Sequence, residues 1–126
     1  MSENMRLSRP MRLRSRAEFQ RSRKEGKSFA GKYLVVSVLR DEGATEPLRF
    51  GIILTRKVGN AVARNRVRRR VRSLLSKYGG RIEPGHQLVI IARYTAPGAS
   101  FDELENDWVK QLRRAGILAE EAAVEN

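Results

Sequence analysis

Residues 56–78, which read RKVGNAVARNRVRRRVRSLLSKY, constrain this chain more than any other stretch. They contain nine basic residues and no acidic residue. Apolar side chains recur among them at the spacing of one face of an α-helix, namely Val67, Val71, Leu74, Leu75 and Tyr78. Because a helix turns about 100° per residue, the arginines project from the opposite side and from one flank. The pattern predicts a helix that packs on a core and presents a fixed array of cations.

Local signals define the ends of this helix. Asn60 is expected to be the N-cap, because its side-chain oxygen can accept from a free amide of the first turn. Gly79 and Gly80 are expected to end the helix.

Six arginines fall between positions 64 and 72, and they repel one another by a few tenths of a kcal/mol per neighbouring pair. A helix face that only contacts solvent gains nothing from this repulsion. Arginine forms paired hydrogen bonds with phosphate, so the pattern indicates a polyanion as partner.

Size and charge limit the possible classes of protein. The chain has 126 residues, which suits one domain, and a net charge of +12. Residues 1–81 hold 22 of its 26 basic residues and 6 of its 14 acidic residues, so the basic surface comes from the first two thirds. The absence of cysteine excludes disulfides and thiolate metal sites. We expect a cytoplasmic protein that binds nucleic acid.

A membrane partner is the weaker alternative. No apolar run approaches the roughly 20 residues that span a bilayer, and the basic N-terminus lacks the apolar region of a signal peptide. The basic helix also has no Trp or Phe on its apolar side, where an interfacial helix would carry its anchors.

The remaining pattern predicts a small, single-domain α+β fold. We expect a flexible basic arm at 1–14, the folded domain at 15–117, and an acidic, disordered tail at 118–126. Besides the basic helix, we expect helices at 16–25 and 100–116 and strands at 32–39, 48–55 and 87–94. The polar, turn-rich link between the first two strands predicts that they pair antiparallel. The basic helix then forms a crossover, which predicts that the second and third strands are parallel.

Two aromatic residues each have two interpretations. Phe19 is the only large apolar side chain of the first helix, and it either plugs the core or lines a groove and stacks on an unpaired base. Trp108 is in register with the apolar stripe of the last helix and has acidic neighbours, so core packing is favoured over base stacking. Both helices begin with Ser and, three residues later, Glu, which is the spacing of a capping box.

Groups that could perform enzymatic chemistry are scarce. His86 is the only histidine, and we expect it in a Pro-Gly turn without a chemical role. No phosphate-binding loop, dinucleotide fingerprint or Cys/His metal pattern is present. The motif content is therefore that of a binder. A DNA-binding helix is disfavoured, because arginines around more than half of the helix leave little neutral surface for contacts with base edges.

The run FGIILTRKVGNAVARNRVRRRVRS at 50–73 resembles the signature of the protein component of bacterial ribonuclease P, with a strand, a basic pair before V-G-N-A-V, and an Arg-Asn-Arg helix. Further matches are LRSRAEFQRSRKEGKSFAGKYLVV upstream and LVIIARYTAP downstream. The resemblance covers about residues 12–117. It implies a small α/β sandwich in which the basic helix makes a left-handed crossover, whereas the twist of strands ordinarily favours the right-handed form.

The resemblance also implies a function. The chain would be the protein subunit of ribonuclease P, in which a large RNA subunit with bound Mg²⁺ removes the 5′ leader of precursor tRNA. The protein would bind the RNA subunit and hold the leader in a cleft between its first helix and the sheet. Catalytic groups and magnesium are expected on the RNA, so we expect no catalytic residue and no metal site on this chain. The alternative is a non-enzymatic protein that binds structured RNA, of the ribosome-associated type.

Carried onto this sequence, the motif of the family marks two groups of residues. Those expected to contact the catalytic RNA are Arg64, Asn65, Arg66, Arg68, Arg69 and Arg72. Those expected to contact the substrate leader are Phe19, Arg16, Arg23, Tyr33, Ser37, Arg56, Lys57 and Asn60. Many relatives have a second aromatic residue at the position of Arg23 and a strand aromatic at that of Ser37. The cleft is therefore expected to hold the leader more by charge and less by stacking.

Overall fold

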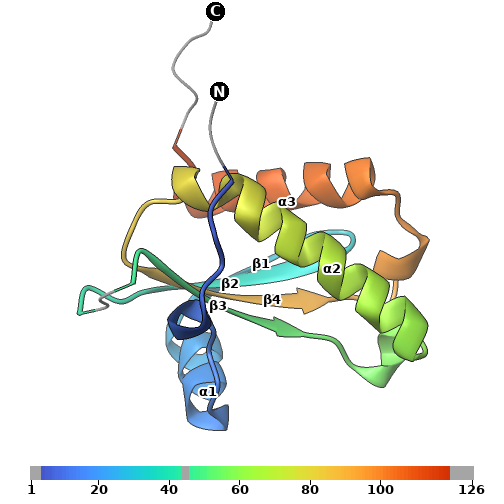
Figure 1. Cartoon of the computed structure of the whole chain (residues 1–126), viewed down its shortest axis with the longest axis horizontal. Helices are drawn as coiled ribbons and strands as arrows, with labels where there is room; N and C mark the ends of the chain where they lie inside the picture. Colours follow the sequence, from blue (N-terminus) through green and yellow to red (C-terminus); the bar gives the residue numbers. More distant parts are fainter. Residues whose placement is uncertain (1–3, 44–45, 120–126) are drawn as a thin grey trace, which may run out of the picture.

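The computed structural model describes residues 4–43 and 46–119, which form a four-stranded sheet and three α-helices. The helices are α1 (Arg16–Glu25), α2 (Ala61–Tyr78) and α3 (Phe101–Ala115). The strands are β1 (Lys27–Ala30), β2 (Leu34–Arg40), β3 (Leu48–Ile53) and β4 (His86–Ala92). Single 3-10 turns are η1 (Arg9–Met11), η2 (Arg56–Val58), η3 (Gly79–Arg81) and η4 (Ala96–Gly98). Figure 1 shows α2 and α3 on one face of the sheet and α1 on the other, which confirms the predicted α+β class.

The strand order is β1-β2-β4-β3, and this corrects one predicted pairing. The antiparallel pair expected from strands 32–39 and 48–55 is wrong, because β4 lies between β2 and β3. The polar link at 41–47 can step across β4, since seven residues reach roughly 23 Å and neighbouring strands lie only about 4.8 Å apart. The predicted parallel pairing of β3 with β4 is confirmed. The four residues of β1 are too few and too polar to give a strand pattern in the sequence.

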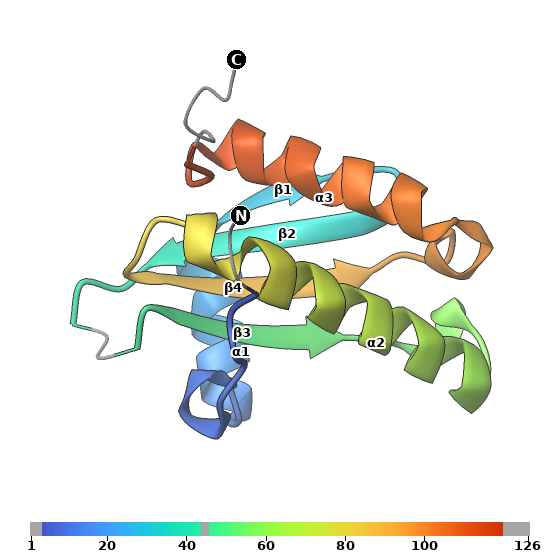
Figure 2. The ribbon, with the colours of Figure 1, turned by 45° about the horizontal axis from the view of Figure 1, so that its top comes forward.

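The β3-α2-β4 unit is a left-handed crossover. Figure 2 views the sheet from the side of α2, with β3 and β4 both pointing to the right and β4 lying above β3. When this view is turned so that β3 and β4 point upward, the chain leaves β3, passes through α2 in front of the sheet, and enters β4 on the left of β3. This confirms the crossover that the family resemblance implied, against the usual right-handed preference.

One core fills the space between the sheet and the pair α2 and α3. Its largest fully buried side chains include Trp108, Phe50, Leu34, Leu48, Leu74, Leu75, Leu88 and Ile90. The predicted core role of Trp108 is confirmed, because its side chain is fully buried in this cluster. Burial contributes about 1.5–3 kcal/mol for each such side chain, so the apolar side of α2 is firmly attached to the sheet.

Local capping signals place the other two helices as predicted. At the start of α1, Ser15 Oγ accepts from Glu18 N at 3.1 Å, and at the start of α3, Ser100 Oγ accepts from Glu103 N at the same distance. Both form the reciprocal capping box. α3 ends at Gly116, whose φ of 72° lies in the left-handed region that favours glycine.

The N-terminal segment is docked over residues 4–14 and is not the flexible arm that was expected. Met5 N donates to Ser76 O at 2.6 Å, and Ser76 Oγ donates to Met5 O at 2.6 Å, which ties the segment to α2. Met11 and Leu13 are buried, and Leu13 N donates to Phe50 O at 2.7 Å. The segment therefore covers the outer edge of β3, which would otherwise expose unpaired backbone groups.

The C-terminal boundary also shifts. Leu118 forms a bridge with Ile82, and Ala119 N donates to Arg81 O at 2.7 Å, so these residues belong to the domain and not to the expected tail. Residues 120–126, the rest of that expected tail, lie outside the described residues. In the part of the chain that the structure describes, no helix combines the length and the apolar character that a membrane crossing requires.

A buried carboxylate that sequence analysis did not single out attaches α3 to the sheet. Asp107 is 9% exposed, and its Oδ2 accepts from the backbone N–H groups of Tyr33 at 2.9 Å and Leu34 at 3.0 Å. Its Oδ1 accepts from Gln111 Nε2 at 3.0 Å. Gly31 leaves room for this carboxylate, because a Cβ there would approach Oδ1 too closely. The turn between β1 and β2 is thus bound to the middle of α3.

Asp107→Asn is expected to lower the free energy of unfolding by about 1–3 kcal/mol, because an amide nitrogen would leave a buried N–H group without an acceptor. Urea denaturation followed by circular dichroism measures this change. Asn106→Ala, at the exposed neighbouring position, is the control and should change the same quantity by about 0.5 kcal/mol or less. Equally small changes in both variants would contradict the anchoring role of Asp107.

Candidate nucleic-acid interface

The first turn of α2 is held in place by its own side chains. Asn60 Oδ1 accepts from Ala63 N at 2.9 Å, so the predicted N-cap is confirmed. Gly59 has a φ of 139°, which a residue with a side chain rarely adopts, and it joins η2 to the helix. Arg64 Nη1 donates to Gly59 O at 2.6 Å and closes the turn. The loop that carries Arg56 is therefore fixed relative to the helix.

The arginines of α2 lie on the side opposite the core, as the periodicity predicted. The buried stripe is Val67, Val71, Leu74, Leu75 and Tyr78. Asn65, Arg66, Arg68 and Arg69 are exposed, and Arg64 and Arg72 are half-buried. The six residues expected to contact RNA thus share one helix, on which Asn65, Arg69 and Arg72 project away from the core and Arg66 lies on the flank toward Pro97. Their contact with RNA stays a prediction.

Some of these arginine side chains make contacts within the chain that use few of their guanidinium N–H groups. Arg68 Nη1 donates to Asn65 Oδ1 at 3.0 Å, and the Arg72 guanidinium lies 5.9 Å from the centre of the Phe50 ring. Arg69 has no hydrogen-bond or ion-pair partner among the described residues. A guanidinium carries five N–H donors, so each of these side chains keeps donors for a phosphate.

The opposite face of the sheet carries α1 and the second group of predicted residues (Figure 1). The Phe19 ring packs on Gly51 of β3, where a Cβ would lie 2.3 Å from Phe19 Cε1, so only glycine leaves room for it. The side chain is nevertheless half-exposed. The ring therefore packs on the sheet without being fully buried, and its stacking on an unpaired base stays a prediction. Arg16 and Arg23 are exposed on the same helix.

The structure does not place Tyr33 and Ser37 on the accessible part of this face. Ser37 is fully buried, and its Oγ shares a hydrogen bond of 2.7 Å with Ser28 Oγ. Tyr33 precedes β2, and its hydroxyl donates to Glu103 Oε2 at 3.4 Å, toward α3. Ser37 is therefore not accessible to a leader in this structure, whereas contact between Tyr33 and the leader stays a prediction.

Other apolar residues of the α1 face are accessible instead. Val35, Ile53 and Ile91 are half-exposed and lie side by side, since Val35 pairs with Ile91 and Ile53 pairs with Ile91 across neighbouring strands. Alternation along a strand places them on the same face as Gly51. Sequence analysis missed this group because the placement of the three residues side by side depends on a strand order that it had wrong.

The remaining predicted contacts lie where β3 ends. Arg56 and Lys57 form the exposed turn η2, and Asn60 is exposed at the start of α2. This loop joins the strand that carries Gly51 to the helix that carries the arginines. Along the chain, it therefore connects the α1 face of the sheet to the arginine helix.

Acid–base and metal-binding groups do not gather near either group. His86 is buried at the start of β4, and its Nδ1 lies 2.7 Å from Glu83 O. Within residues 4–43 and 46–119, no group of three or more His, Cys, Asp or Glu side chains could hold a metal ion. What the described residues offer is a surface for binding.

Known proteins give independent comparisons. A family model described as Ribonuclease P matches residues 7–116. The "Ribonuclease P protein component" of Syntrophomonas wolfei is 32% identical over 116 residues, which cover 92% of this chain and 96% of that protein. The protein of the same name from Symbiobacterium thermophilum is 37% identical over 115 residues, covering 91% and 99%.

Solved structures agree with these sequences. The RNase P protein of Staphylococcus aureus superposes with a TM-score of 0.79 at 29% identity, covering 86% of this chain and 97% of that one. The RNase P protein from Thermotoga maritima superposes with a TM-score of 0.72 at 33% identity, covering 82% and 96%.

The attachment of α1 gives a prediction about pH. Glu18 accepts from the backbone N–H groups of Ser15 and Arg14 and pairs with Arg49 of β3 at 2.7 Å, which lowers its pKa to about 2. A carboxylate with a lowered pKa stabilises the fold above its unfolded pKa, near 4.5, and this contribution is lost as the pH falls toward 2. Glu18→Gln should therefore lower the free energy of unfolding by about 1 kcal/mol at pH 7 and flatten its decline below pH 4.5.

Thermal melts between neutral and acid pH measure both effects. Glu25→Gln is the control, because Glu25 only makes a surface pair with Arg21 at 3.4 Å, which is worth a few tenths of a kcal/mol. Identical pH profiles for the Glu18 variant and the native chain would rule out this role for Glu18.

Proposed function

The chain belongs to the ribonuclease P protein family, and from this we propose that the arginine side of α2 binds the catalytic RNA subunit of that enzyme. As a member of this family, the chain is an accessory subunit of the endoribonuclease that processes tRNA 5′ ends, and its partner is RNA. The proposal further places the 5′ leader of precursor tRNA on the α1 side of the sheet. We propose that the assembly works in the cytoplasm.

The observation that carries the proposal is the pre-positioned array of cations on α2. Arg66, Arg68 and Arg69 are exposed on a helix whose other side is buried. Contact with phosphates releases counterions from the RNA, which favours binding and makes affinity depend steeply on salt. Because the helix is already fixed, little further order is required of its backbone when RNA binds.

The leader is proposed to lie along the accessible apolar strip beside α1. Phe19 is half-exposed, and Val35, Ile53 and Ile91 provide an apolar floor. Arg16 and Arg23 on α1 and the η2 turn supply positive charge around it. Such a surface suits an unpaired strand, whose bases can stack and whose backbone is anionic.

Catalysis in this proposal is done by the RNA. Mg²⁺ is assigned to the RNA subunit, as the family resemblance implies. This chain lowers the repulsion between two polyanions and holds the leader in one position, and that orients the bond to be cleaved. The η2 turn, which lies between the two proposed surfaces, is expected to be nearest that bond.

A cleavage assay at low Mg²⁺ tests the proposal directly. Adding the protein to the catalytic RNA should accelerate removal of the 5′ leader, because the protein neutralises charge that Mg²⁺ otherwise screens. Arg69→Ala should require about ten times more protein for half of the maximal effect near physiological salt. A protein that binds the RNA without accelerating cleavage would instead fit the non-enzymatic, ribosome-associated alternative.

Phe19→Ala is expected to weaken binding of precursor tRNA by about 5- to 100-fold, the equivalent of one lost stacking contact, with little change for mature tRNA. Phe19→Leu keeps most of the packing on Gly51 but removes the aromatic ring, so it should show a similar selective loss. Fluorescence titration of the assembled holoenzyme with both tRNAs measures the effect. Equal losses on both tRNAs, with a lower melting temperature, would show that Phe19 only packs.

A further inference from the structure

A further basic surface, which shares Arg66 with the arginine side of α2, follows the seam where α2 lies beside α3. Arg66 and Arg70 are one turn apart on the flank of α2 that faces the segment before α3. Arg66 Nη2 donates to Pro97 O at 3.1 Å, and Arg70 Nη1 donates to Ala99 O at 2.9 Å. Each guanidinium is thus fixed by one bond to a backbone carbonyl and keeps other donors.

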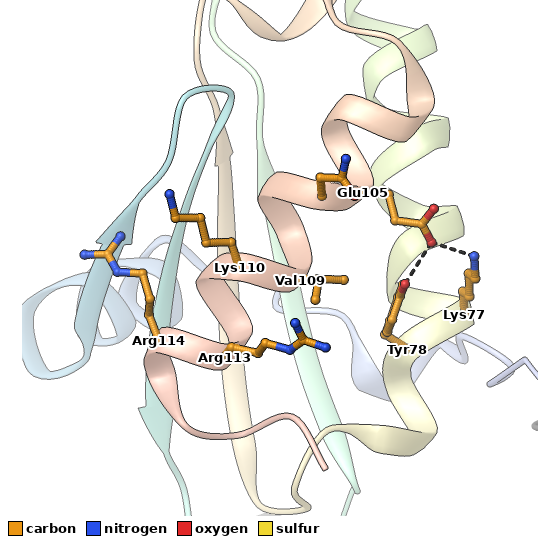
Figure 3. A pocket seen from close by; sticks show the side chains of 8 residues that line it. Lys77, Tyr78, Glu105, Val109, Lys110, Arg113 and Arg114 are labelled. Carbon is orange, nitrogen blue, oxygen red and sulfur yellow. Dashed lines mark hydrogen bonds and ion pairs between the residues drawn. The ribbon is translucent and has the colours of Figure 1, made fainter. Parts of the chain in front are cut away.

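Farther along the seam, a hollow of about 710 Å³ lies between the C-terminal parts of α2 and α3 (Figure 3). Its lining is Lys77, Tyr78, Glu105, Asn106, Val109, Lys110, Arg113 and Arg114. Four of these side chains are cationic and one is anionic. The hollow is therefore a basic site on a helix that is otherwise acidic at its start.

The single acid of the hollow is already occupied. Glu105 Oε2 accepts from Lys77 Nζ at 2.5 Å and from the Tyr78 hydroxyl at 2.9 Å. Lys110 and Arg113, by contrast, have no side-chain partner among the described residues. Figure 3 shows the Arg113 side chain extending from α3 toward the α2 side of the hollow. Two cations are thus left for a ligand from outside the chain.

Helix electrostatics explain only part of this arrangement. Cations in the last turn of a helix are stabilising by about 0.3–1 kcal/mol wherever they lie around its circumference. Arg114 fits that explanation, since it turns away to donate to Gln111 Oε1 at 2.6 Å and to Ala30 O at 3.2 Å. Arg113 instead extends toward the α2 side of the hollow, and Lys110 lines the hollow with its amine on the side away from α2 (Figure 3).

We infer that the seam between α2 and α3 binds a second stretch of RNA backbone, with phosphates held by Lys110 and Arg113 at one end and by Arg66 and Arg70 at the other. α2 has 18 residues and is about 27 Å long, so the seam can follow several nucleotides. An acidic protein segment fits less well, because Val109 is the one aliphatic side chain of the lining and protein interfaces need a buried apolar centre. The inference rests on the proposed function, because it takes the catalytic RNA as the ligand.

The test measures binding of the catalytic RNA, without tRNA, to a variant that carries Lys110→Ala and Arg113→Ala. Affinity near physiological salt should fall about tenfold, and the slope of log affinity against log salt should become shallower by about 1.5–2, as expected for two lost phosphate contacts. A second variant with Lys110→Arg and Arg113→Lys keeps both charges and should bind like the native chain. Thermal melts verify that each variant is folded.

The matched control carries Arg21→Ala and Arg40→Ala. It removes two positive charges, as the seam variant does, but from arginines that already pair with glutamates of this chain. It should change affinity by less than about twofold, because such pairs are solvated surface contacts. If the seam variant behaves like this control while Arg69→Ala still weakens binding, the seam inference is wrong and the proposed function stands. If Arg69→Ala also has no effect, the proposed function fails as well.

Discussion

Six arginines crowd nine residues of α2, and the structure depends on how their repulsion is offset. Neighbouring like charges on a helix oppose folding by a few tenths of a kcal/mol per pair. The fully buried Val67, Val71 and Leu74 on the other side stabilise the packed helix by about 1.5–3 kcal/mol each. Burial therefore outweighs the repulsion, and the six arginines keep their charge without an ion-pair partner in the part of the chain that the structure describes.

This offset connects the fold to its role in the enzyme. Around α2, the N-terminal segment bonds to Ser76, the Asn60 cap fixes the first turn, and Asp107 attaches α3 to the sheet. The sheet then separates an arginine surface on one side from an apolar strip beside Phe19 on the other. In the proposed function, this chain contributes by holding two RNAs in a fixed relation, which is catalysis by position and charge.

The features that could be predicted from the sequence are those that depend on residues close together in the chain. Helix ends followed from Asn60, from Ser15 and from Gly116, because capping depends on residues within one turn. Strand order did not follow, since the insertion of β4 between β2 and β3 depends on contacts distant in the chain. The burial of Ser37 was missed for the same reason. Met11 and Leu13 alternate with arginines, and the charge around them obscured their packing against the domain.

The central claim is that the two sides of the sheet face different RNAs, and a tethered cleavage probe tests it most directly. The chain has no cysteine, so Ser73→Cys on α2 and Gln20→Cys on α1 each offer one attachment point for iron–EDTA. In the assembled enzyme with precursor tRNA, the account predicts strand scission in the catalytic RNA from position 73 and in the 5′ leader from position 20. Scission of the leader from position 73, with the catalytic RNA untouched by that probe, would contradict it.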